Sequence, residues 1–176
     1  MTLNGFENVK IIHMALGLEN KTAKLYINAD NDAGHALWNV GRHPEHIQSR
    51  MHCITRDVKV VSLDNLLHDS HIPPIKLINI DTYGAEFDII QGAVSTLLDK
   101  QVPYVVCGIH PFGLQQMDTS EHELRQFMSY MGYEAYWIRS EAPYLVPYVA
   151  DQEIASASDA SMLFANTAFC NAPGAA

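Results

Sequence analysis

The second half of the sequence changes repeatedly between short apolar runs and amphipathic segments. Residues 75–80 and 104–109 are nearly continuous apolar runs of strand length, and residues 133–138 form a third run. Between the first two runs, apolar residues recur at every third or fourth position over residues 87–98, as they do along the buried face of a helix. Strands that alternate with helices predict a three-layer α/β fold, with helices packed on the faces of a mostly parallel sheet.

A second helix is predicted between the last two runs. Ser120 and Glu123 have the spacing of a capping box, in which the serine oxygen accepts a first-turn amide and the glutamate reaches back to the cap amide. Gly132 is suited to the left-handed residue that ends a helix. We therefore expect this helix to begin after Ser120 and to end before Gly132.

The pattern is weaker in the rest of the chain. We expect strands over residues 9–16, 24–27 and 58–63, loops over residues 28–35 and 41–53, a helical turn over residues 64–67, and a last edge strand over residues 162–165. A chain of 176 residues has room for one ordinary domain. We assign residues 1–165 to that domain and residues 166–176 to a flexible tail.

Charge and composition argue against several function classes. The formal net charge is -9 and the eleven Lys and Arg residues are scattered, so the sequence does not predict nucleic-acid binding. No apolar run approaches the ~20 residues of a membrane-spanning helix, so no membrane association is expected. The three cysteines form no C-x-x-C pair and no signal peptide precedes them, which favours a cytoplasmic location.

Two polar residues directly follow predicted strands. Asp81 ends the first apolar run and His110 ends the second, and ligands of parallel sheets bind beyond the carboxyl ends of the strands. Asp81 is either a ligand contact or only the cap of the next helix, where a carboxylate is favoured. His110 is either a general base, since an imidazole titrates near neutral pH, or a turn residue fixed by the proline after it. Glu86 is interpreted as a helix-start carboxylate.

The nine histidines raise the question of a metal site. The candidate ligands are His43, His46 and His52 beside Cys53, and the pair His68 and His71. Zinc needs three or four converging ligands, and these spacings match neither H-E-x-x-H nor a C-x-x-C pair. No bound metal is therefore predicted.

Three blocks of sequence resemble the carboxyl-terminal half of FkbM-type methyltransferases. They are VVSLDNLL at 60–67, INIDTYGAE at 78–86 and IHP at 109–111, and they occur in the order that the family shows. The opening LNGFENV at 3–9, which leads into MALG at 14–17, is similar to the family's passage from its second helix into its third strand. The resemblance covers roughly residues 3–138.

This resemblance implies the Rossmann-like methyltransferase fold, truncated at its amino-terminal end. It further implies S-adenosylmethionine as cofactor and O-methylation of a small-molecule or sugar hydroxyl, with Asp81 and His110 as the catalytic residues. The family's glycine-rich turn and ribose-binding acid would lie upstream of Met1, so we expect weak or absent cofactor binding by this chain. The cofactor-side positions that match the family are Ala15, Leu16, Gly17, Asp32, Gly34 and Asp81. The alternative for the loop positions among them is that they belong to ordinary solvent-facing loops and contact no cofactor.

The chain also departs from the family's pattern. Tyr83 stands where many relatives have an acidic or amide residue, and Gly108 stands where they have an acidic one. The alternative function is therefore a non-catalytic binding or assembly module that keeps the sheet without the chemistry. The missing strands would normally separate the strand at 9–16 from the strand at 75–80, and closure of the sheet by a second copy, as a homodimer, is one way to complete it.

Overall fold

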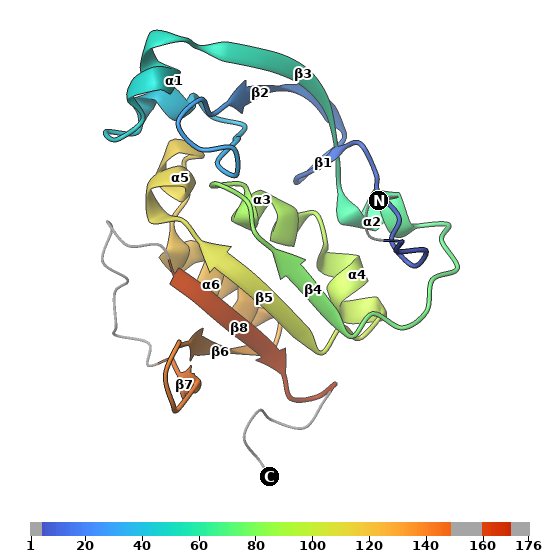
Figure 1. Ribbon diagram of the computed structural model, residues 1–176. Coiled ribbons are helices and arrows are strands. Elements are labelled where there is room, and N and C mark those ends of the chain that lie inside the picture. The colour runs from blue at the N-terminus through green and yellow to red at the C-terminus, as the bar shows by residue number, and fades with distance from the viewer. Residues whose placement is uncertain (1–4, 149–159, 170–176) are drawn as a thin grey trace.

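The computed structural model describes residues 5–148 and 160–169, which form two β-sheets and a set of short helices (Figure 1). The strands are β1 Ala15–Leu16, β2 Lys21–Ile27, β3 Ile54–Val61, β4 Leu77–Ile80, β5 Tyr104–Ile109, β6 Tyr133–Ile138, β7 Leu145–Pro147 and β8 Ala160–Asn166. The helices are η1 Val40–Arg42, α1 Ile47–Met51, α2 Leu63–Leu67, α3 Glu86–Gln91, α4 Val94–Asp99, α5 Pro111–Gln116 and α6 Glu121–Tyr130. The fold is therefore of the mixed α/β class.

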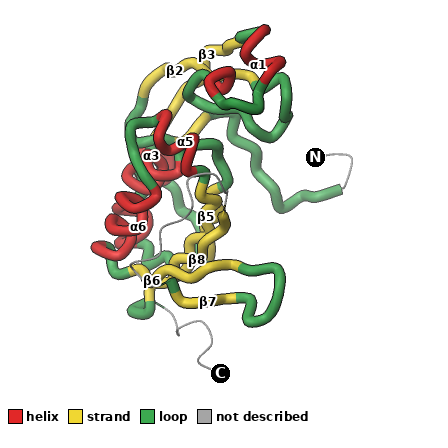
Figure 2. Tube along the Cα trace, turned by 90° about the vertical axis from the view of Figure 1, so that its left-hand side faces the viewer, coloured by secondary structure: helices red, strands yellow, loops and turns green. Residues whose placement is uncertain are grey.

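The five-stranded sheet carries the main core. Its strand order is β4-β5-β8-β6-β7. Alternate residues of β5 are fully buried, namely Val105, Cys107 and Ile109, because successive side chains of a strand point to opposite faces. Figure 2 shows α3, α5 and α6 on one side of this sheet. The predicted three-layer arrangement is therefore not confirmed in the part of the chain that the structure describes.

The prediction of a mostly parallel sheet is wrong. Only β4 and β5 pair in parallel in this sheet, whereas β8 pairs antiparallel with both β5 and β6, and β7 pairs antiparallel with β6. Because β8 opposes both neighbours, β5 and β6 still run in the same direction. Hydrophobic periodicity identifies strands but carries no information about which strands become neighbours. Here β8, the last strand of the described chain, lies between β5 and β6.

The expected edge strand at 162–165 is therefore also misplaced. It forms part of β8, which lies between β5 and β6, and Met162 and Phe164 are fully buried. Asn166, the first residue of the predicted tail, ends β8 and is buried, with its backbone amide donating to the Pro103 carbonyl at 3.0 Å. Residues 170–176 of that tail lie outside the described residues.

The helices and strands around β5 follow the sequence closely. β5 and β6 have the predicted bounds, and α6 begins after Ser120, whose Oγ accepts the Glu123 amide at 3.2 Å. The Glu123 carboxylate accepts the Ser120 hydroxyl at 3.0 Å instead of the cap amide. Gly132 has φ +87, as expected of a left-handed residue after a helix. Local signals thus determine this region.

One predicted helix is divided in two. The segment that was expected to be continuous forms α3 and α4, separated by Gly92 and Ala93. A Cβ atom at Gly92 would lie 2.1 Å from the Gly17 carbonyl oxygen, so the backbone there is pressed against the chain that follows β1. This close contact between distant segments leaves room only for glycine at a position that lies between the two helices.

The amino-terminal region forms a separate three-stranded sheet, with the order β1-β3-β2. Figure 1 shows β2 and β3 arching over α3. The predicted strand at 9–16 is reduced to β1, because no strand of the described residues pairs with residues 9–14, and Val9 and Ile11 are exposed. The loop expected over residues 41–53 contains most of η1 and all of α1. The Asp30 carboxylate caps α1 by accepting the amides of Gln48 and Ser49, each at 2.8 Å.

Within the described ranges, no helix has the length and apolar character needed to cross a membrane.

Candidate functional site

The structure places Asp81 and His110 at the same edge of the five-stranded sheet. Asp81 follows β4 and His110 follows β5, and these two strands pair in parallel with Ile80 opposite Cys107. A Cβ atom at Gly108 would lie 3.1 Å from the Asp81 Oδ1 and 3.0 Å from the His110 Cε1. The two side chains therefore converge above Gly108, as expected of residues that follow neighbouring parallel strands.

A buried carboxylate holds His110 in place. The Glu86 Oε1 lies 2.7 Å from the His110 Nδ1 and accepts the Gly84 amide at 3.1 Å. Glu86 is fully buried, and its Oε2 has no hydrogen-bond partner among the described residues. An ionised carboxylate only accepts hydrogen bonds, so we assign the ring proton of His110 to Nδ1 and the basic lone pair to Nε2. Glu86 thus fixes the orientation of the imidazole.

Interpretation of the sequence missed this role of Glu86, although a signal for it exists. Glu86, Ile90, Ala93 and Leu97 follow helical spacing, and all four are buried. An acidic residue in register with a buried apolar face needs a partner inside the protein, because an isolated buried charge is costly. The partner here is His110, which lies 24 positions further along the chain.

Gly84 and Gly113 allow Glu86 to reach His110, because their backbones lie in close contact. Gly84, in the turn between β4 and α3, has φ +106, and a Cβ atom there would lie 2.6 Å from the carbonyl of Gly113 in α5. Only glycine combines that left-handed backbone with such close contact between two backbones. The close approach brings the start of α3, with Glu86, beneath the start of α5, which follows His110.

Two carboxylates, those of Asp81 and Glu86, lie near the buried thiol of Cys107. Burial raises the pKa of Cys107 well above its ordinary value, and the carboxylates of Glu86 and Asp81 raise it further. Cys107 therefore remains a thiol at neutral pH. The same two carboxylates favour positive charge at the edge of the sheet.

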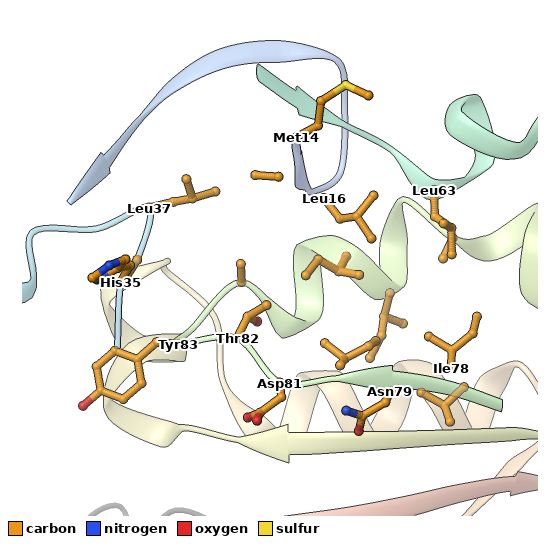
Figure 3. A pocket seen from close by; sticks show the side chains of 18 of the residues that line it. Met14, Leu16, His35, Leu37, Leu63, Ile78, Asn79, Asp81, Thr82 and Tyr83 are labelled. Atoms are coloured by element: carbon orange, nitrogen blue, oxygen red, sulfur yellow. The ribbon is translucent and has the colours of Figure 1, made fainter. Parts of the chain in front are cut away.

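A mostly apolar cavity of about 330 Å³ lies between β1, β4 and α3 (Figure 3). Ala15, Leu16 and Asp81 line it, so the structure brings together three of the residues predicted to contact a cofactor. In Figure 3, Leu16 lies on the opposite side of the cavity from Ile78 and Asn79 of β4. Thr82 also lines the cavity, and its Oγ1 is buried without a hydrogen-bond partner among the described residues. A bound ligand could satisfy such a hydroxyl.

The other predicted cofactor residues lie outside this lining. Gly17 donates its amide to the Val61 carbonyl at 3.1 Å, which attaches β1 to β3. The Gly34 carbonyl accepts the Asn28 side-chain amide at 3.2 Å and so closes the loop after β2. Asp32 is exposed in the same loop. In the structure, these hydrogen bonds of the two glycines lie within the three-stranded region.

A second, more polar cavity of about 460 Å³ lies on the other side of Tyr83. Tyr83 lines both cavities, whereas Asp81 lines only the apolar one and His110 only the polar one. Tyr83 is fixed in this position because its ring stacks on Trp38 at 5.5 Å between centroids, and the Trp38 Nε1 donates to its carbonyl at 2.6 Å. The site therefore consists of two chambers that share one aromatic wall.

No group of three or more His, Cys, Asp or Glu side chains is placed to hold a metal ion in the described parts of the chain. His43 and His46 do approach each other, with ring centroids 4.4 Å apart. Their nitrogens have other partners: the His46 Nδ1 lies 2.9 Å from the Val40 carbonyl, and the His43 Nδ1 accepts the Glu45 amide at 3.3 Å. These contacts position the two rings as walls of the polar cavity.

Comparison with known proteins gives one match. Residues 3–135 match the family model described as the methyltransferase FkbM domain, which covers well over half of the 176 residues. The searches of curated proteins and of solved structures returned no significant match.

Proposed function

This chain belongs to the methyltransferase FkbM domain family, and from that premise we propose that it takes part in transfer of a methyl group from S-adenosylmethionine to an oxygen of a small-molecule or sugar hydroxyl. The observation that carries the proposal is the convergence of Asp81 and His110 above Gly108. Asp81 belongs to the apolar cavity and His110 to the polar one, so a donor and an acceptor bound in the two chambers would meet at this edge.

The residues of the apolar cavity suit part of the cofactor. Apolar walls that include Ala15 and Leu16 fit an adenine ring, and Thr82 offers an unpartnered hydroxyl. Asp81 is the one carboxylate among the described lining residues, and its charge favours a cationic sulfonium. No glycine-rich strand-to-helix turn lines this cavity, so we expect binding weaker than micromolar.

The residues of the polar cavity suit proton removal. S-adenosylmethionine, when bound, supplies an electrophilic methyl group. The chain supplies His110, whose Nε2 accepts the proton of the acceptor hydroxyl while Glu86 stabilises the imidazolium through Nδ1. Alignment of the two reactants contributes much of the rate of such a displacement, and the shared wall at Tyr83 provides a fixed boundary between them.

The alternative is a non-catalytic binding or assembly module. The edge strand β4 favours it, because Leu77 is 53% exposed and β4 pairs only with β5. Ile11 and Ile12 are also exposed, in the segment before β1. Unpaired strand edges with apolar side chains attract further strands, so a homodimer belongs to this alternative.

Titration followed by NMR separates the two proposals. We expect millimolar S-adenosylmethionine to shift the amide signals of Ala15, Leu16 and Thr82, and we expect Asp81→Asn to weaken this binding about tenfold, which corresponds to ~1.4 kcal/mol. Asp32→Asn is the matched control, because it removes an exposed carboxylate outside the cavity. Absence of any shift at these amides would favour the non-catalytic module, and equal effects of both variants would refute the assignment of the cavity.

A further inference from the structure

The polar cavity has walls made of rings. Phe112 and His43 contact edge to face, with centroids 4.7 Å apart, and Tyr83 and His110 do so at 5.2 Å. Phe112 also packs against Trp38 at 5.6 Å, which fixes its position from behind. Because these rings support one another, the cavity is preformed and presents flat apolar surfaces to a ligand.

Apart from these rings, the described lining of the polar cavity contains polar side chains but no lysine or arginine. Asn31 and Glu45 contribute an amide and a carboxylate, and neither Lys nor Arg is among the described lining residues. Arg42 and Arg50, which are close in sequence to His43 and His46, have other partners: Arg42 donates to the Gln116 side chain at 3.4 Å and Arg50 donates to backbone carbonyls. A phosphate or carboxylate in this cavity would therefore meet the carboxylate of Glu45 without a lysine or arginine to pair with.

The three histidines of the lining are already engaged by other groups. The His43 Nδ1 accepts the Glu45 amide, which requires that nitrogen to be unprotonated and the ring to be neutral. His46 is 8% exposed, and its Nδ1 is directed at the Val40 carbonyl. His110 is paired with Glu86, so the pair carries no net positive charge even when the imidazole is protonated.

We propose that this cavity is the acceptor site and that it takes an uncharged ring that bears a hydroxyl group, with the ring against Phe112 and Tyr83 and the hydroxyl toward His110. The proposal rests on the proposed function for the identity of the acceptor, and it adds a selection against anionic acceptors. Phenols and glycosides share this chemistry, since a phenol stacks its face on aromatic rings and a sugar places its C–H face on them. Phe112 and Glu45 are the residues that determine selectivity.

The experiment measures binding to the chain without cofactor. The four probes are phenol, methyl glucoside, and the charged counterparts phenyl phosphate and glucose 6-phosphate, each titrated into isotope-labelled protein. We expect at least one neutral probe to shift the amide signals of Tyr83, Phe112 and Gly113, and each phosphate to bind at least tenfold more weakly than its neutral counterpart. Whichever neutral probe binds more tightly distinguishes the phenol from the sugar.

Two variants test the residues. Phe112→Ala should weaken the neutral probe about tenfold, whereas Tyr130→Ala, which removes a 91% exposed ring elsewhere, should leave its affinity unchanged. Glu45→Lys changes an exposed side chain and should strengthen phosphate binding without loss of the neutral probe, and Glu141→Lys, with the same change in charge, should not. The Glu45 variant keeps the test valid if Phe112→Ala fails to fold.

Tighter binding of a phosphate by the wild-type chain would overturn the proposal. So would the absence of shifts at the cavity amides, or equal effects of Glu45→Lys and Glu141→Lys. These results are independent of the cofactor titration. A chain that binds the neutral ring but not S-adenosylmethionine would support the acceptor site and argue against methyl transfer by this chain.

Discussion

The five-stranded and three-stranded sheets differ in how far their strands are buried. In β5, Val105, Cys107 and Ile109 are fully buried, whereas β2 has no buried residue and β3 has only Val60. Burial of apolar surface is the main stabilising contribution to folding, so the free energy of unfolding depends mostly on the five-stranded sheet. The candidate site joins a firmly packed wall, which carries Glu86 and His110, to a loosely packed wall formed by β1.

The largest expected effect tests the firmly packed region. Phe164 in β8 is fully buried, and Phe164→Ala should lower the free energy of unfolding by about 3–5 kcal/mol, because it removes contacts and leaves a cavity. Leu25→Ala in the half-exposed strand β2 should cost about 1 kcal/mol. Denaturant unfolding measures both values. Equal losses for the two variants would mean that the sheets contribute equally to stability.

A more local effect tests the wall that holds His110. Glu86→Ala should move the ring proton of His110 from Nδ1 to Nε2, because the acceptor at Nδ1 is lost. Glu86→Gln should keep it at Nδ1, since the amide oxygen can take the position of Oε1, where it also accepts the Gly84 amide. Nitrogen chemical shifts of the imidazole measure the tautomer. An unchanged tautomer in Glu86→Ala would show that other contacts orient His110.

The smallest effect concerns the loosely packed region and appears only in acid. Desolvation raises the pKa of Asp30, but hydrogen bonds from the amides of Ser49 and Gln48 and from the Ser49 hydroxyl, together with the charge of His46, lower it to about 2. Because the folded pKa lies below the ordinary value of 3.8, the stabilisation is fully present above about pH 4 and is lost as the pH falls through about 2.

Amide exchange over α1 measures this acid effect. Protection of the Gln48 and Ser49 amides should fall between pH 4 and pH 2, after correction for intrinsic exchange, while protection in β5 persists to lower pH. Asp30→Asn removes the titrating group and should abolish the difference between these two pH values. Parallel loss of protection in α1 and β5 would contradict the separation of the two regions.

Parts of the site were predictable and parts were not. Asp81 and His110 were identified because each ends an apolar run, and the parallel pairing of β4 and β5 brings such positions together. The helical spacing of Glu86 indicates a buried carboxylate, but it does not identify the partner, His110, which lies 24 positions away. Gly108, which looked like a loss of polar chemistry, lies where even a Cβ atom would make tight contacts with both Asp81 and His110.

The sequence alone determined the features that depend on neighbouring residues. These are the strands β5 and β6, the cap at Ser120, the left-handed Gly132 and, through three short motifs, the methyltransferase family. Only the tertiary structure decided where β8 inserts, that α3 and α4 separate at Gly92, and that Glu86 meets His110. The physical reason is that periodicity and capping act over a few residues, whereas strand order and buried side-chain hydrogen bonds are set by packing between segments far apart in the chain.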